Sequence, residues 1–108
     1  MAYYMVQAAY TSEAIAAMVK KPEDRGAAIR PVVEKLGGKL VGIWFCFGEY
    51  DVVGISELPD NVSAAAFAFA VSQGGKVKAL KTTPLMTGDE AVKAMKKAGG
   101  AGYRAPGS

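Results

Sequence analysis

Residues 41–57, VGIWFCFGEYDVVGISE, constrain the fold of this chain more than any other stretch. They hold two apolar runs, residues 41–47 and 52–55, on either side of the short polar segment Gly48-Glu49-Tyr50-Asp51. Apolar runs of strand length around a glycine-containing break are typical of a β-hairpin. We therefore expect two adjacent antiparallel strands here, with the rest of the chain packed against them.

The first strand of this hairpin is predicted over residues 39–47 and is apolar on both faces. Strict alternation puts Leu40, Gly42, Trp44 and Cys46 together on one face. Such a strand is expected to be buried on both sides, which makes Cys46 a buried, inert thiol. One face would pack against helices of the same chain, and the other against a partner subunit or a ligand cavity.

With the hairpin included, strands are predicted at residues 3–10, 39–47, 49–57 and 76–86. A helical region is predicted between the first two strands, at residues 11–36. Helices are also predicted at residues 62–73, before the last strand, and at residues 89–98, after it. Within the helical region Pro22 ends or bends one helix, and Pro31 is expected to kink or restart the next. This order predicts an α+β, ferredoxin-like βαββαβ fold: a four-stranded antiparallel sheet with helices on one face, plus a short C-terminal helix. Two uncovered sheet faces would then pack together as a dimeric α+β barrel. Residues 1–98 form the expected domain, and residues 99–108 a flexible tail.

Composition excludes several kinds of protein. The chain has no histidine, which rules out Ser-His and Cys-His nucleophile pairs and leaves a poor set of zinc ligands, so we expect no metal and no cofactor. The single Cys46 rules out an internal disulfide and fits the cytoplasm. The net charge of +3 comes with few aromatics among the late lysines, which argues against nucleic acid. No apolar run approaches the roughly 18 residues of a membrane span.

Four side chains are the candidate ligand contacts, and each has a structural alternative. Gln7 is the polar residue in the middle of an apolar strand, and points either into a cavity or to solvent. Trp44 forms either an aromatic wall for a planar ligand or part of the core. Tyr50 either donates to a ligand oxygen or packs its ring. Asp51 either accepts a proton or an ammonium group, or caps backbone N–H groups.

No catalytic residue is assigned from the sequence. Arg25 and Arg30 are interpreted as surface charges, with an anion contact at the rim of a pocket as the alternative. The lysines near the predicted last strand are interpreted as solvated groups that protect a sheet edge.

The segments YMVQAAYT at residues 4–11, LGG at 36–38, FGEYDVV at 47–53 and ELPDN at 57–61 resemble the GYD-domain family, as does KALKTTPLMTGDEAVKAM at 78–95. The resemblance covers residues 3–97 and implies the dimeric α+β barrel, while it implies little about activity. More distantly, the Gly-x-Tyr-Asp stretch is similar to the effector-binding domain of Lrp/AsnC regulators, which bind small effectors such as amino acids at oligomer interfaces. The elements expected for this sequence do not include the DNA-binding helix-turn-helix of those regulators.

Three functions remain open. The first is an oligomeric binding module that holds a small organic ligand between facing sheets, with a second copy of the chain as its partner. The second is a small cofactor-independent enzyme of isomerase or monooxygenase type that uses Asp51 and Tyr50. The third is a purely structural assembly protein. The contents of the cavity distinguish them, because an apolar cavity with polar anchors favours binding and a titratable group in it favours catalysis.

Overall fold

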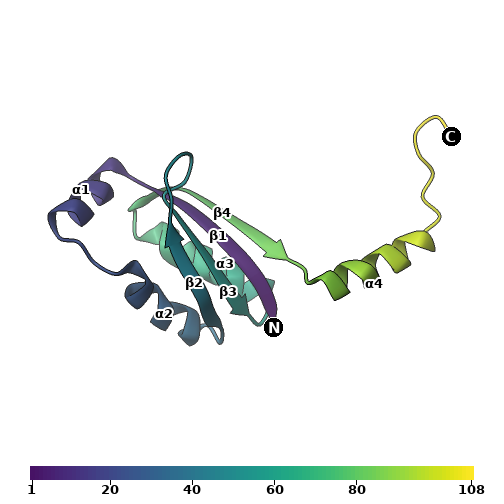
Figure 1. Ribbon diagram of the computed structural model, residues 1–108, viewed down its shortest axis with the longest axis horizontal. Coiled ribbons are helices and arrows are strands. Elements are labelled where there is room, and N and C mark those ends of the chain that lie inside the picture. Colours follow the sequence, from purple (N-terminus) through teal and green to yellow (C-terminus); the bar gives the residue numbers. More distant parts are fainter.

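The structure is a computed structural model that describes residues 1–108 (Figure 1). It contains four strands and four helices, in the order β1 (Ala2–Tyr10), α1 (Ser12–Lys20), α2 (Arg25–Lys35), β2 (Lys39–Phe45), β3 (Val52–Leu58), α3 (Asn61–Gln73), β4 (Val77–Leu85) and α4 (Gly88–Gly99). The strands form one antiparallel sheet in the order β2-β3-β1-β4. This confirms the ferredoxin-like α+β fold that the order of the sequence patterns predicts.

The core lies between the sheet and the helices on one of its faces. Tyr4 from β1 and Leu58 from β3 are buried against Val33 of α2 and Phe67 of α3. The Tyr4 hydroxyl donates a hydrogen bond of 2.7 Å to Oδ1 of Asn61, the first residue of α3. The apolar faces of both helices are therefore fixed to the two central strands, which is where burial stabilises the fold most.

Side chains cap the helices where the sequence places them. Thr11 Oγ1 accepts the Ala14 N–H at 3.1 Å, and Asp24 Oδ1 accepts the Gly26 N–H at 2.9 Å, so α1 and α2 begin at separate caps. Helix α2 continues through Pro31 and does not restart there, in contrast to one of the two expectations. Pro31 lies on an exposed part of the helix, where solvent can satisfy the carbonyl that proline leaves without a donor.

Strand β2 differs from the predicted alternation. Its pairing with β3 is irregular between Leu40 and Gly42, so Leu40 joins Ile43 on the helix-covered face while Gly42 and Trp44 face the other way. The indole of Trp44 lies over Gly42, where an added methyl group would stand 2.6 Å from the ring. The prediction that Leu40 and Trp44 share a face was wrong, because one extra residue in a strand inverts every side chain beyond it.

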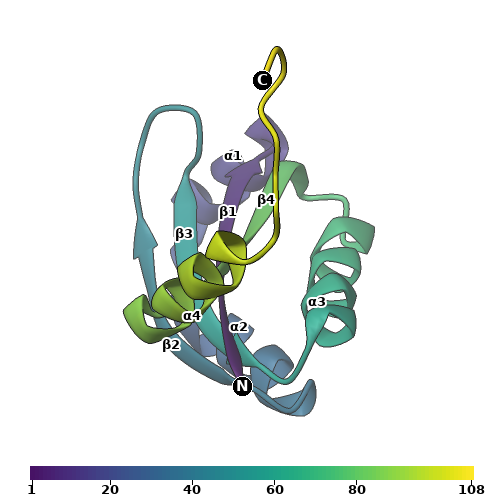
Figure 2. The same cartoon turned by 90° about the vertical axis from the view of Figure 1, so that its right-hand side faces the viewer.

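The end of the hairpin is also more exposed than expected. Strand β2 is an edge strand that ends at Phe45, and Trp44 and Phe45 are more than half exposed in the single chain. Cys46 is exposed as well, so the prediction of a buried thiol was wrong. The helices do not cover this part of β2, and the connection from residue 46 to residue 51 projects beyond the sheet (Figures 1 and 2). Gly48 has a φ of 128°, a value that L side chains rarely adopt.

Helix α4 projects away from the body as an arm (Figures 1 and 2). The radius of gyration is 17.4 Å, against about 13 Å for a compact domain of this length. The sequence Thr87-Gly88-Asp89-Glu90 forms a capping box at the start of α4, with Thr87 and Glu90 each bonding the backbone N–H of the other. Val92 and Met95 on α4 are 49% and 69% exposed, so the apolar side of the arm has no cover within the chain.

Candidate functional site

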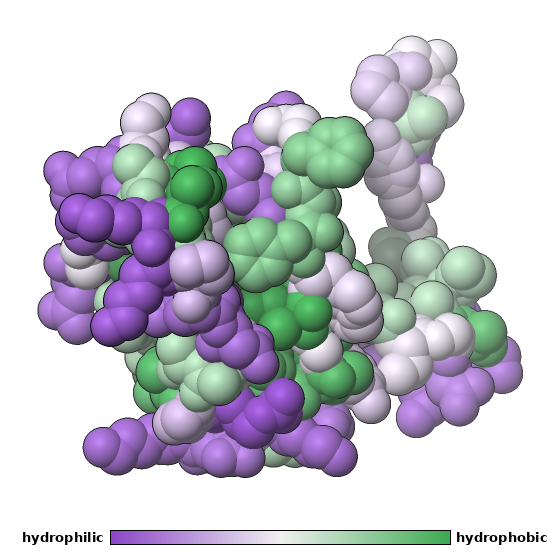
Figure 3. Space-filling model, turned by 60° about the vertical axis from the view of Figure 1, so that its left-hand side comes forward, coloured by the Kyte–Doolittle hydropathy of each residue, from purple (hydrophilic) through white to green (hydrophobic).

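A cavity with a volume of about 310 Å³ lies between the sheet and helices α2 and α3. It exists because α2 packs over β2 while α3 packs over β3 and β4, so the two helices diverge above β1. Small residues leave room for it: Ala8 and Gly54 form part of the floor, and Ala28 of α2 and Ala70 of α3 form part of the walls. Figure 3 shows hydrophobic side chains gathered in the middle of one face of the body, with hydrophilic ones around them.

Apolar side chains dominate the lining. Fourteen of the 19 lining residues are hydrophobic. The floor comes from β1, β2, β3 and β4 and the walls from α2 and α3, and the largest apolar contributors are Val6, Ile29, Val32, Leu40, Ile43, Val52, Phe67, Val71 and Leu80. Such a lining with a few polar groups is typical of sites for small organic molecules.

The polar lining groups gather mainly at one end of the cavity. Arg25, Lys76 and the hydroxyl of Tyr10 line the large cavity and also a neighbouring cavity of about 160 Å³, so these three residues stand at the junction of the two. Ser56 lies towards the opposite end, since it pairs with Tyr4 at the start of β1. Tyr10 lies six positions after Tyr4 along the strand, a span of roughly 20 Å. The cavity therefore has a basic end and an apolar body.

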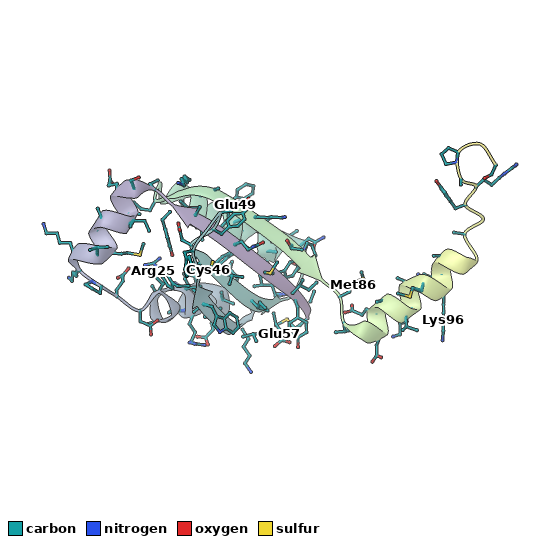
Figure 4. The ribbon with its side chains drawn as sticks, turned by 45° about the horizontal axis from the view of Figure 1, so that its top comes forward. Arg25, Cys46, Glu49, Glu57, Met86 and Lys96 are labelled. Carbon is teal, nitrogen blue, oxygen red and sulfur yellow. The ribbon has the colours of Figure 1, made fainter.

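Arg25 is the best-positioned charged group. It is the first residue of α2, and Figure 4 shows it at the start of that helix. Its Nη1 donates to Oε1 of Glu23 at 2.7 Å, while its Nε is shielded from solvent and has no partner. Partial burial works to lower its pKa, but the bond to Glu23 and the nearby Tyr10 hydroxyl outweigh this and raise the pKa above its usual value. The guanidinium is therefore always charged.

Tyr10 and Lys76 are held beside Arg25 by the pairing of β1 with β4. The Thr11 N–H donates to the Lys76 carbonyl at 2.9 Å, which places Lys76 next to the end of β1. The Tyr10 ring stacks on the Phe45 ring with centroids 6.5 Å apart, and this contact orients its hydroxyl. The Lys76 ammonium forms an exposed ion pair with Glu13, and that pair lowers the pKa of Glu13.

Gln7 and Trp44, two of the four candidate contacts, lie on the open face of the sheet, away from the cavity. Val6 and Ala8 line the cavity, so Gln7 between them points to the other side. Gln7 pairs with Val53, and Val53 pairs with Trp44, which puts the three residues in one row across β1, β3 and β2. They form a shared surface that only a second molecule or a ligand on the open face would reach.

Asp51 has a defined contact with the backbone. Its Oδ2 accepts the Tyr10 N–H at 2.8 Å, and its own N–H donates to the Ala8 carbonyl at 2.9 Å. The carboxylate thereby caps β1 where its register with β4 shifts, between Ala9 and Tyr10. Tyr50 accepts a bond from the Cys46 thiol through its carbonyl, at 3.3 Å. Cys46 and Glu49 lie in the same projecting connection (Figure 4), and neither Tyr50 nor Asp51 lines either cavity.

Sequence reasoning did not identify the basic end of the cavity as a site. Arg25 was interpreted as a surface charge, with the rim of a pocket as the alternative, and Lys76 as a solvated edge lysine. What distinguishes Arg25 and Lys76 from other surface charges is their position at the rim of the cavity, beside the apolar end of a strand. That position depends on tertiary packing. No three His, Cys, Asp or Glu side chains come together where they could hold a metal ion. None of the helices has the length and apolar character needed to cross a membrane.

Comparison with known proteins gives a family and a fold. The family model described as "GYD domain" matches residues 4–95. The solved structure titled "crystal structure of FFRP-DM1" superimposes with a TM-score of 0.51 at 12% sequence identity, covering 80% of this chain and 100% of that chain. At that identity the likeness shows the fold alone, and at that level it agrees with the distant resemblance to Lrp/AsnC domains. No curated protein matches.

Proposed function

The chain belongs to the GYD domain family, and from this premise we propose that it is a non-catalytic binding module that holds a small organic molecule in the cavity between its sheet and helices α2 and α3. The observation that carries the proposal is the cavity itself, an apolar space of about 310 Å³ with its charged groups at one end. That volume is at the lower end of known small-molecule sites. A ligand between facing sheets, which the fold also allows, stays a prediction for the open face.

The same cavity favours binding over catalysis. Its charged groups are Arg25 and Lys76, and a guanidinium whose pKa is raised cannot take a proton from a substrate. The enzyme alternative relies on Asp51 and Tyr50, which lie outside the lining, and the Asp51 carboxylate already accepts a backbone N–H. A general base must reach the proton that it abstracts. Catalysis by these two residues therefore needs a substrate outside this cavity.

The test fills the cavity from its floor. A side chain at Gly54 would point towards the cavity, and its first carbon fits without a clash, 3.7 Å from the nearest atom, so Gly54→Val places its two further carbons in the cavity and suits a strand. The fluorescent probe N-phenyl-1-naphthylamine, which is neutral and apolar, should bind the wild type with one site per chain. We expect Gly54→Val to lower the affinity for the probe at least tenfold. Ala65→Leu, on the exposed side of α3, is the control and should leave binding unchanged.

An unchanged affinity of Gly54→Val would contradict the proposal. A melting temperature at or above that of the wild type would show that the variant is folded, because replacing a strand glycine removes an entropic cost of roughly 0.5–1 kcal/mol. Loss of probe binding in Trp44→Ala but not in Gly54→Val would instead move the ligand to the open face.

A second role, self-assembly through the open sheet face, is supported by exposed apolar surface. Trp44 and Tyr3 on that face are 53% and 36% exposed, and the arm formed by α4 adds Val92 and Met95. A protein of this size seldom leaves such surfaces uncovered. A second copy of the chain supplies a matching apolar face, and two faces in contact would form the expected α+β barrel.

Native mass spectrometry of the full chain tests this assembly. We expect a homodimer or a larger homo-oligomer for the wild type, and monomers for Trp44→Lys. Val19→Lys is the matched control, because Val19 is 75% exposed on α1, away from the sheet. A wild type that is monomeric at all concentrations would overturn the barrel, whereas the ligand cavity, which lies within one chain, would be unaffected.

A further inference from the structure

We infer that the cavity selects ligands with a carboxylate head and an apolar body, and that Arg25 is the residue that binds the carboxylate. This inference rests on the proposed function and adds the chemical class of the ligand. It depends on the unpaired donor of Arg25, on the two groups beside it, and on the apolar character of the remaining lining.

The free edge of the Arg25 guanidinium matches a carboxylate. Glu23 occupies Nη1, and the structure has no hydrogen bond to Nη2, while Nε has almost no exposed surface. Nε is shielded from water and unpaired, and an unpaired buried donor of this kind destabilises the protein. A carboxylate in the cavity would accept from Nη2, and it would reach Nε as well, in the bidentate geometry that arginine favours, once the side chain turns Nε into the cavity.

Tyr10 and Lys76 complete the head-group site. The stacked Tyr10 ring directs a hydroxyl that can donate to a carboxylate oxygen. Lys76 contributes a second positive charge at the junction of the two cavities. Its present partner Glu13 is exposed, and ion pairs between exposed groups contribute little to stability, so this ion pair opposes an incoming anion only weakly.

The rest of the cavity sets the body of the ligand. Beyond Arg25 and Lys76 the lining offers apolar side chains and one further hydroxyl, from Ser56. Several oxygen atoms of a phosphate dianion would find no hydrogen-bond donor here. A cationic ligand would be repelled by the positive charges of Arg25 and Lys76. A monocarboxylate with an alkyl or aromatic body satisfies both ends, since its carbon surface replaces water along the apolar walls.

Decanoate and 1-decanol test the inference, because they share an alkyl chain and differ in the charge of the head group. Isothermal titration calorimetry at pH 7 should show that the wild-type protein binds decanoate about tenfold or more tightly than 1-decanol, as a hydrogen bond to a charged group implies. Arg25→Gln should remove this preference and keep the affinity for 1-decanol. Arg30→Gln, on an exposed part of the same helix, should keep the preference.

Arg25→Lys and Tyr10→Phe refine the test. Lysine keeps the charge but lacks the two-donor edge, so it should lose most of the preference for decanoate. Tyr10→Phe should lower the affinity for decanoate a few-fold and leave the affinity for 1-decanol unchanged. Unchanged binding of 1-decanol shows in each variant that the cavity is intact.

Two results separate this inference from the proposed function. If the wild type binds decanoate and 1-decanol equally, the assignment of a carboxylate ligand is wrong while the binding module stands. If it binds neither of them, nor the neutral fluorescent probe, both are wrong. A preference for decanoate that survives in Arg25→Gln and disappears in Arg30→Gln would overturn the role of Arg25.

Discussion

Replacing Asp51 by alanine should destabilise the protein without affecting its cavity. The carboxylate accepts the Tyr10 N–H at 2.8 Å in a partly buried position, where β1 changes its register. Alanine leaves that N–H without a partner. A hydrogen bond to a charged group contributes about 1.5–3 kcal/mol to stability. We therefore expect the free energy of unfolding to fall by about 2 kcal/mol.

Thermal and urea unfolding, followed by circular dichroism at one fixed protein concentration, measure this change. For a body of this size a loss of about 2 kcal/mol corresponds to a fall of roughly 10 °C in Tm. Asp51→Asn keeps an oxygen acceptor and loses only the charge, so its Tm should fall by about half as much as that of Asp51→Ala. Glu49→Ala is the matched control, because Glu49 lies exposed in the same connection.

A different pattern would refute this reasoning. If Asp51→Ala unfolds at the wild-type temperature, the bond to Tyr10 does not stabilise β1. If Asp51→Asn keeps its stability and loses ligand binding or turnover, Asp51 acts on a ligand. In that case the functional interpretation of the Gly48–Asp51 segment would replace the structural one.

Three further results are expected. Leu58→Ala should lower the free energy of unfolding by about 2–5 kcal/mol in urea, because Leu58 is 1% exposed in the core; a smaller loss than that of Ile15→Ala on the surface of α1 would contradict this core. The bond from the Thr87 N–H lowers the pKa of Glu90 in the folded arm, so the contribution of this carboxylate is present at neutral pH and is lost as the pH falls through its folded pKa. Helix content should fall on acidification, and it should do so less in Glu90→Gln, because the glutamine amide does not titrate while it can still accept the Thr87 N–H. Cys46 should react completely with a thiol reagent in the native protein, since it is exposed in the single chain; protection that ends on dilution would instead place it in an oligomer interface.

Much of the fold was predictable because its signals are local. Runs of apolar residues identified the strands, and the residues that cap α1 and α4, Thr11 and Thr87, lie within two residues of the predicted starts of those helices. The structural alternative for Asp51, a cap on backbone N–H groups, was also open to sequence reasoning, because aspartate beside a glycine turn commonly does this.

The errors concern packing over longer distances. The irregularity after Leu40 inverted the faces of β2, and its local signal was Gly42, since glycine inside a strand often marks a bulge. Cys46 and Phe45 are exposed because α2 covers only the first part of β2. A pattern of apolar residues indicates that a strand requires cover, but not how far a helix of the same chain reaches along it.

The sequence by itself determined the order of the elements, the capped helix ends and membership of the GYD domain family. These depend on neighbouring residues and on spacing along one chain. Only the tertiary structure decided where a ligand could bind. Tyr10, Arg25 and Lys76 come from three separate segments, and they meet because β1 pairs with β4 while α2 and α3 diverge above the sheet. The volume left between those helices follows from how whole elements pack, which no local pattern specifies.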